Sequence, residues 1–131
     1  MANQVKMVFD NQFQGILTGQ HGSVQVGSKE GSLVPYDMVL GGLGGCLNHT
    51  FQSILDKKKV QVHAIHYDIT GTKRETVPTT LEMVDIIVQI TGAEETLYEK
   101  IEKSFEQATR YCSVYQTISH VADMRYKVEF N

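Results

Sequence analysis

The pattern of apolar and polar positions predicts an α+β fold that starts with strands and continues into a long helix. Residues 4–34 have the pattern of short strands with glycine-containing turns, and apolar side chains alternate at Val5, Met7 and Phe9. Pro35 suits the first position of a helix, because its missing N–H would be unpaired there anyway. We expect this helix to end near Lys58.

The first half of this helix is apolar on nearly every side. From Met38 to Phe51 it contains no Asp, Glu, Lys or Arg, and a helix of that kind is normally buried all round. Its glycines at positions 41, 42, 44 and 45 each weaken the helix by roughly 1 kcal/mol relative to alanine. Close packing of another backbone would offset that loss. One sheet covers only one side of a helix, so we infer an obligate, intertwined homodimer in which two sheets enclose it.

A hairpin and a second helix are predicted after the long helix. Ile65, Tyr67 and Ile69 alternate along one predicted strand, residues 84–90 alternate along a second, and the polar stretch Gly71–Thr80 is predicted to be the loop between them. Thr91 and Glu94 have the spacing of a capping box, with Thr91 as the N-cap. One apolar stripe follows on the helix, made of Leu97, Ile101, Phe105, Ala108 and Cys112.

The C-terminal segment has the clearest strand pattern in the sequence. Between Ala122 and Phe130 apolar and charged residues alternate strictly, which is typical of a strand buried on one face. The predicted order is therefore N-terminal β-strands, a buried central helix, a β-hairpin, a second helix and a C-terminal strand. We expect residues 1–131 to form a single α+β domain.

Size and charge narrow the class of protein. A chain of 131 residues can bury a real core without disulfides. Its net charge of −3 argues against a nucleic-acid partner, which requires a basic face. The N-terminus lacks the apolar stretch of a signal peptide, and no apolar run is long enough to cross a bilayer. We therefore expect a cytoplasmic protein with no membrane partner, in which free thiols stay reduced.

The two cysteines, Cys46 and Cys112, are the main candidates for chemistry, and three interpretations stay open: redox chemistry, metal binding and plain core packing. A reactive thiol must be a thiolate, and Cys46 lies too far into its helix for the helix dipole to help. His49 stands three residues after Cys46, and Cys112 with His120 would complete a four-ligand set. Nothing in the spacing demands such a site, so we expect no metal and no cofactor, and we expect His49 to be a core or interface histidine.

Asp37 lies in the first turn of the predicted helix and has two interpretations. Its carboxylate stabilises the helix N-terminus, or it orients a cation or accepts a proton near Cys46. Nine residues separate Asp37 from Cys46, which places the two on opposite sides of an ideal helix. The neighbouring Tyr36 points closer to the direction of Cys46 and offers a hydroxyl instead.

Two segments of the chain resemble a known family. They are Pro35-x-Asp37-x-x-Leu40-x-x-Leu43-Gly-Gly-Cys46 and Tyr111-Cys112-Ser113-Val114. Together they are similar to the OsmC/Ohr family, the osmotically inducible and organic hydroperoxide resistance proteins. The resemblance implies an intertwined homodimer that acts as a thiol-dependent peroxidase on organic hydroperoxides. It also implies that Cys46 forms a sulfenic acid, that Cys112 resolves it as a disulfide, and that an external dithiol restores both thiols.

The chain departs from the family pattern at the groups that activate the thiol. Active members use an arginine from the N-terminal strands and a glutamate just after the helix-starting proline. Residues 1–34 contain no arginine here, and Tyr36 holds the glutamate position. The remaining candidate cations are Lys6, Lys29, Arg74 and Arg110. The alternative function is a catalytically inactive dimer of the same fold that binds a small apolar ligand or has a structural role.

Overall fold

The computed structural model describes residues 1–131, which form two compact units, Met1–Gly41 and Gly42–Asn131. The division falls inside the long helix α1, Pro35–Lys57, which begins at the predicted proline and ends one residue before the predicted end. The expectation of a single domain over residues 1–131 stays a prediction.

The first unit is a three-stranded antiparallel sheet, as the alternating pattern predicted. Its strands are β1 (Lys6–Phe9), β2 (Gln14–Thr18) and β3 (Ser23–Gly27), in the order β1-β2-β3. Several large apolar side chains of this unit are exposed, namely Met7, Val8, Phe9, Phe13, Ile16, Leu33 and Val34. A small sheet with so much exposed apolar surface is a candidate for contact with another surface.

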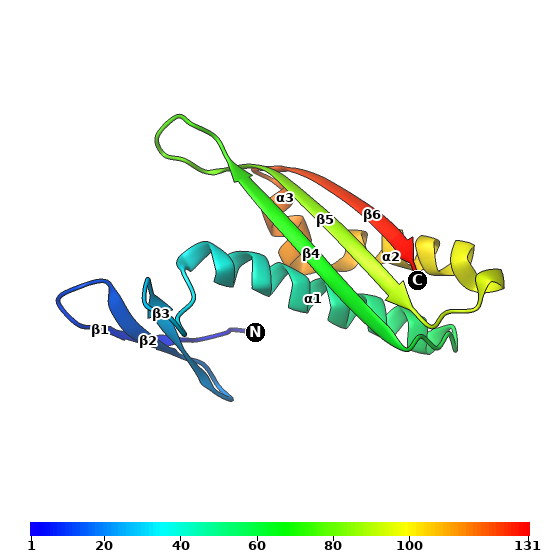
Figure 1. Cartoon of the computed structure of the whole chain (residues 1–131), viewed down its shortest axis with the longest axis horizontal. Helices are drawn as coiled ribbons and strands as arrows, with labels where there is room; N and C mark the ends of the chain where they lie inside the picture. Colours follow the sequence, from blue (N-terminus) through cyan, green and yellow to red (C-terminus); the bar gives the residue numbers. More distant parts are fainter. The chain divides into compact units, whose positions relative to one another are not determined.

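The second unit contains a three-stranded sheet and the helices that cover it (Figure 1). The strands are β4 (Ala64–Lys73), β5 (Leu81–Thr91) and β6 (Asp123–Phe130), in the order β4-β5-β6. β4 and β5 form the predicted antiparallel hairpin, whereas β6 runs parallel to β5. A parallel pair needs a long crossover. Three helical segments supply it: the 3₁₀ turn η1 (Glu95–Leu97), α2 (Tyr98–Tyr111) and α3 (Ser113–Ser119).

The core of this unit lies between the sheet and the helices. Its fully buried members come from α1, from the central strand β5 and from α2; they include Leu43, Leu47, Phe51, Leu55, Val84, Ile86, Val88, Ile90, Ile101, Phe105 and Ala108. The rings of Phe51 and Phe105 meet edge to face, with centroids 5.1 Å apart, which is a favoured geometry for aromatic pairs. This contact fixes α1 against α2.

The start of the second helix differs from its prediction. Thr91 is the last residue of β5, where it pairs with Ala64 and accepts a hydrogen bond from the His63 N–H. Gly92 then turns the chain with a φ of 80°, and Glu94 makes no side-chain capping bond. The predicted capping box is therefore wrong, because strand pairing holds the residue that would have been the N-cap. The hairpin loop is also shorter than predicted, since β4 continues to Lys73.

Within one chain α1 is buried along one stripe rather than all round. Contacts within one chain account for the glycine at position 44, because a Cβ there would come within 3.0 Å of the Ile69 side chain. Gly42 and Gly45 are exposed, and a Cβ on either would meet nothing within 4 Å. His49 is exposed on the same side of the helix. The prediction of all-round burial is not met by a single copy of the chain, and the homodimer stays a prediction.

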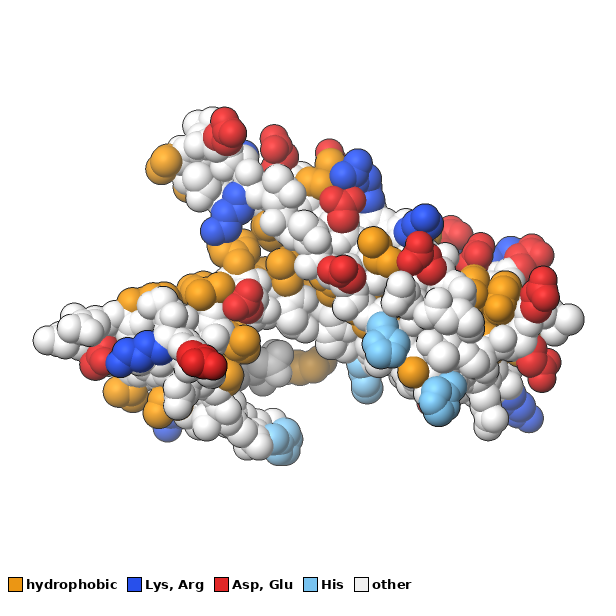
Figure 2. All heavy atoms as spheres, viewed as in Figure 1, with side chains coloured by type: hydrophobic (Ala, Val, Ile, Leu, Met, Phe, Trp, Pro, Cys, Tyr) orange, Lys and Arg blue, Asp and Glu red, His pale blue; other side chains and the backbone are white.

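No helix has both the length and the apolar character that crossing a membrane requires. On the face drawn in Figure 2, acidic and basic side chains are interspersed rather than gathered into one basic patch. The expectation that no nucleic acid binds stays a prediction.

Candidate functional site

Cys46 lies on α1, on the border between its buried stripe and its exposed side. Leu43 and Leu47, one turn before and one residue after it, are fully buried, whereas the Cys46 thiol is only partly covered. Its Sγ lies 3.8 Å from Ser113 Oγ at the start of α3. The thiol is free and accessible to a small molecule.

Cys112 occupies the junction between α2 and α3 and is completely buried, with 0% exposure. Its backbone N–H donates to the Ala108 carbonyl at 2.8 Å and closes the last turn of α2. Its Sγ accepts a hydrogen bond from the Tyr115 N–H at 3.4 Å and acts as the N-cap of α3. Hydrogen bonds thus hold both the backbone N–H and the sulfur of Cys112 in defined positions.

The fold brings these two thiols together. The Cys112 thiol lies close enough to Cys46 that each group shifts the pKa of the other, downward for Cys46 and upward for Cys112. Two thiols that lie near each other are candidates for a redox pair.

Neutral hydrogen-bond donors lower the pKa of Cys46. Burial acts in the opposite sense and raises the pKa, but the Val114 N–H, the Cys112 thiol, and the hydroxyl and N–H of Ser113 outweigh it. A hydrogen bond donated to a thiolate favours its charged form. The thiolate is therefore stabilised without a cation among these groups, at the point where the sequence had suggested that a cation was needed.

Cys112 behaves in the opposite way. Burial raises the pKa of its thiol to about 11, helped by the hydrogen bond to Cys46 and by the charge of Cys46, while the Tyr115 N–H acts against the rise. At neutral pH Cys46 is thus the thiol that ionises first, and Cys112 keeps its proton.

Tyr67 and Asn48 form a polar contact between β4 and α1, close to Cys46 in the sequence. The Tyr67 hydroxyl donates to Asn48 Oδ1 at 3.0 Å, and Asn48 stands two residues after Cys46 on α1. Burial raises the pKa of Tyr67, and the charge of Cys112 raises it further. The phenol therefore stays protonated and can donate.

The sequence pointed to neither this contact nor the role of Ser113. The motif Tyr111-Cys112-Ser113-Val114 carries the family resemblance, but it does not indicate that Ser113 and Val114 lower the pKa of Cys46. A serine directly after a candidate resolving cysteine was the only available signal. Asn48 and Tyr67 belong to separate elements, and no local pattern connects them.

The structure assigns Asp37 a structural contact. Its Oδ2 accepts a hydrogen bond of 3.0 Å from the Val34 N–H, and its own N–H donates to the Val34 carbonyl at 3.0 Å. A carboxylate that reaches back from the third helical position satisfies one of the unpaired N–H groups of the helix start. This matches the first interpretation of Asp37, and its part in thiol chemistry stays a prediction.

Two of the candidate cations in the second unit have other neighbours. Arg74 donates from Nε to the Pro78 carbonyl at 2.7 Å within the hairpin loop. Arg110 lies near Tyr126, where its charge opposes the rise that burial causes in the tyrosine pKa. Both interactions are compatible with the stabilisation of Cys46 by neutral donors.

No group of three histidine, cysteine or acidic side chains comes close enough to bind a metal ion. His49 is exposed rather than part of the core of this chain, and His120 is exposed as well. His49 and His120 therefore do not form such a group with the two cysteines.

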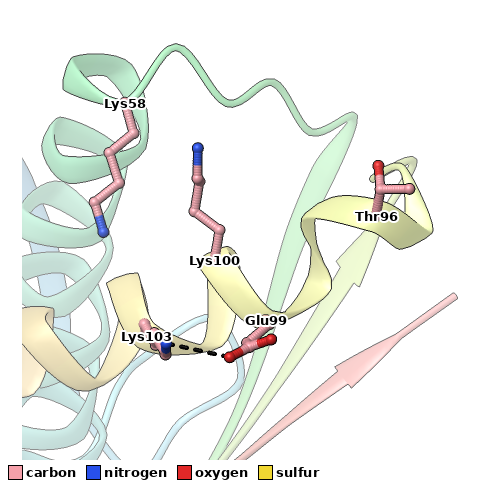
Figure 3. Close-up of a pocket in the computed structure, with 5 residues that line it drawn as sticks. All are labelled: Lys58, Thr96, Glu99, Lys100 and Lys103. Carbon is pink, nitrogen blue, oxygen red and sulfur yellow. Dashed lines mark ion pairs between the residues drawn. The ribbon is translucent and has the colours of Figure 1, made fainter.

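A hollow separate from the two thiols lies at the C-terminal end of α1. It has a volume of about 460 Å³ and is lined by Lys58, Lys100 and Lys103 together with Thr96 and Glu99. Lys103 forms an ion pair with Glu99 at 3.1 Å, marked by the dashed line in Figure 3. Lys58 donates to Ser104 Oγ at 2.8 Å. Lys58 follows Cys46 by three turns of helix, about 18 Å along its axis. The hollow contains no cysteine, so the thiol pair is the stronger candidate site for redox chemistry.

Comparison with solved structures shows the fold. A hypothetical protein of Aquifex aeolicus matches with a TM-score of 0.83 at 22% identity, over 100% of this chain and 98% of that one. An OsmC-like protein of Mycoplasma pneumoniae matches with a TM-score of 0.87 at 12% identity, over 99% and 97%. An organic hydroperoxide resistance protein of Bacillus subtilis matches with a TM-score of 0.71 at 13% identity, over 98% of both chains. These identities are low, so the likeness concerns the fold alone.

The sequence itself identifies the family. No relative was found among curated proteins, but residues 27–127 match the family described as OsmC-like protein. The matched range includes the long helix, both cysteines and nearly all of the second unit. The resemblance carried by the two cysteine motifs is confirmed, and the chain belongs to the OsmC-like protein family.

Proposed function

We propose that the protein is a thiol-dependent peroxidase that reduces organic hydroperoxides, with Cys46 as the attacking thiol and Cys112 as the resolving thiol. The observation that carries the proposal is the pairing of a partly exposed Cys46, whose pKa is lowered, with a buried Cys112 that keeps its proton. Structural relatives described as organic hydroperoxide resistance proteins, from Legionella pneumophila and Bacillus subtilis, support the substrate class.

The first step oxidises Cys46. Its thiolate attacks the outer oxygen of the hydroperoxide, the O–O bond breaks, and the alkoxide leaves as an alcohol after it takes up a proton. The sulfur now carries a hydroxyl group as a sulfenic acid. The donors around Cys46 hold its negative charge before the attack, because they stabilise the thiolate in a site that is partly closed to water.

The second step forms a disulfide. Cys112 loses its proton and attacks the Cys46 sulfur, the S–O bond breaks, and the hydroxyl group leaves as water with that proton. The sum is one hydroperoxide and two thiols converted to one alcohol, one water and one disulfide. An external dithiol then reduces the disulfide by thiol exchange and restores both cysteines.

The functional form we propose is an intertwined homodimer. Gly42, Gly45 and His49 form an open strip on α1, and the small sheet carries the exposed apolar residues named above. A second copy would cover both surfaces, and small residues let two helix backbones approach closely. The dimer would also enclose the thiol site, which one chain leaves partly exposed.

Turnover tests the proposal directly. Purified protein is given a defined organic hydroperoxide, such as cumene hydroperoxide, with dithiothreitol as the external dithiol, and peroxide consumption is followed. We expect catalytic consumption by the wild type and background rates for Cys46→Ser. Ser53→Ala is the matched control, because Ser53 lies on the same helix and only donates to the His49 carbonyl. Equal rates in the wild type and Cys46→Ser would refute the mechanism.

One observation favours the second candidate function, the binding of a small apolar ligand. A hollow of about 400 Å³ between α1 and α2 is lined mainly by apolar surface, including Ile54 and Tyr111. That volume suits a small ligand. Fluorescence of a bound apolar dye would report its occupation, and Ile54→Trp, which fills the hollow, would abolish the signal if this function is correct. An unchanged signal would dismiss it.

A further inference from the structure

The Ser113 hydroxyl faces the reacting sulfur and has no other role in the local structure. Its Oγ lies 3.8 Å from Cys46 Sγ, a hydrogen-bonding distance for sulfur. The side chain that caps α3 is Cys112, whose sulfur accepts from Tyr115, and the backbone carbonyl of Ser113 already accepts from the Thr117 hydroxyl at 2.8 Å. The hydroxyl is therefore not used to close the helix, and Cys46 is its partner.

The direction of this hydrogen bond depends on the charge of the sulfur. Between a neutral thiol and a hydroxyl either group can donate, but a thiolate has no proton and can only accept. When Cys46 is ionised, the Ser113 hydroxyl must donate to it. Hydrogen bonds to a charged acceptor are stronger than those between neutral groups, so the contact favours the ionised sulfur over the neutral one.

We propose that the Ser113 hydroxyl is a further catalytic group, which holds Cys46 Sγ as a thiolate by donating a hydrogen bond to it. This inference rests on the proposed peroxidase function for its biological meaning, but the effect on the thiol is independent of any peroxide. Ser113 follows Cys112 directly in the chain. The same short segment thus supplies both the thiol that resolves Cys46 and the hydroxyl that activates it.

The test measures ionisation of Cys46 without peroxide. Alkylation by iodoacetamide is followed as a function of pH, and mass spectrometry of peptides separates Cys46 from the buried Cys112. We expect Ser113→Ala to move the midpoint for Cys46 upward by about half to one pH unit, and to slow alkylation at neutral pH roughly three- to tenfold. An unchanged midpoint would overturn the proposal.

A matched pair of variants separates the hydroxyl from the shape of the side chain. Ser113→Thr keeps a hydroxyl, whereas Ser113→Val has nearly the same shape without it. We expect the threonine variant to retain the wild-type midpoint and the valine variant to behave like alanine. If both shift equally, the effect is one of packing and the assignment is wrong. Ser119→Ala is the control on the same helix, because Ser119 donates only to the Gln116 carbonyl.

The design also distinguishes this inference from the proposed function. If Ser113→Ala shifts the alkylation midpoint but the wild type consumes no hydroperoxide, the peroxidase proposal fails and the role of Ser113 in thiol ionisation stands. If the wild type turns over hydroperoxide while Ser113→Ala keeps both its midpoint and its rate, the peroxidase stands and the assignment of Ser113 fails.

Discussion

The Tyr67 hydroxyl donates a 3.0 Å hydrogen bond to Asn48 Oδ1 and joins β4 to the turn of α1 that follows Cys46. The bond is partly buried, and the Tyr67 ring lies 6.4 Å from that of Phe105 on α2. One side chain thus contacts the sheet's two covering helices at the level of the thiols. The position of Cys46 relative to the sheet depends on this kind of cross-connection, because α1 has few polar contacts with the sheet.

Removing this hydroxyl tests how much the connection contributes to stability. Tyr67→Phe leaves Asn48 Oδ1 without its donor, and we expect a loss of about 0.5–1.5 kcal/mol in the free energy of unfolding. Urea unfolding followed by circular dichroism measures it. Tyr111→Phe is the control, because the Tyr111 side chain is exposed. Equal stability of the Tyr67 variant and the wild type would show that the bond contributes nothing.

The two thiols should ionise in separate steps. Because hydrogen bonds lower the pKa of Cys46 and burial raises that of Cys112 to about 11, thiolate absorbance in the ultraviolet should rise first below the ordinary thiol pKa and again near pH 11. Cys112→Ala removes one donor to Cys46, so the first step should move to higher pH in that variant. A single step at the ordinary thiol pKa would contradict the geometry of the pair.

Loss of the resolving thiol should stop the cycle after its first step. In Cys112→Ser the sulfenic acid on Cys46 has no neighbouring thiol to capture it, so it should persist and react with dimedone. Intact mass measures the adduct after exposure to hydroperoxide. The double variant Cys46→Ser with Cys112→Ser should show no adduct. An adduct of equal yield in that double variant would place the oxidation outside the thiol pair.

A bulky residue on the open strip of α1 tests the proposed dimer. In one chain a side chain at Gly45 meets nothing within 4 Å, so Gly45→Leu should fold and gain up to about 1 kcal/mol from helix propensity. If two helices pack at Gly45, the leucine should instead dissociate the dimer. Light scattering after size exclusion would show this dissociation. Lys103→Leu, at an exposed position of α2, controls for added hydrophobicity. A wild type that is monomeric at every concentration would refute the dimer.

The contact between Phe51 and Phe105 predicts a large core effect. Both rings are fully buried and meet at 5.1 Å, so Phe105→Ala should reduce the free energy of unfolding by about 3–5 kcal/mol. Val121→Ala, at an exposed position, should change it by about 0.5 kcal/mol or less. Chemical denaturation measures both. A loss below about 1 kcal/mol for Phe105→Ala would show that this packing is not as described.

The strongly periodic segments were predictable from sequence, because one local rule decides their structure. The alternation from Val84 to Ile90 correctly predicted a strand, and its inward positions Val84, Ile86, Val88 and Ile90 are all buried. Pro35 correctly marked the start of α1, because its ring restricts the chain to a conformation that suits the first helical turn. The family resemblance depended on two short motifs and is confirmed by the match over residues 27–127.

The remaining features depend on distant contacts that no local pattern contains. Thr91 has the spacing of a helix cap, but its pairing with Ala64 across the hairpin keeps it in β5. α3 has only two buried side chains, Tyr115 and Ile118. Two apolar positions are too few to show the periodicity of a helix in the sequence. Ser113 and Val114, which lower the pKa of Cys46, belong to this helix. The sequence around Cys46 does not contain them, and it therefore suggested that a cation was needed.

The most direct test of the central claim is the mass of the reduced protein before and after one equivalent of an organic hydroperoxide. The account predicts rapid loss of both free thiols, a decrease of about 2 Da per chain, and a peptide in which Cys46 is linked to Cys112. Thiols that stay unchanged after prolonged exposure would contradict it, and would mean that the two cysteines lie together without reacting as a peroxidase pair.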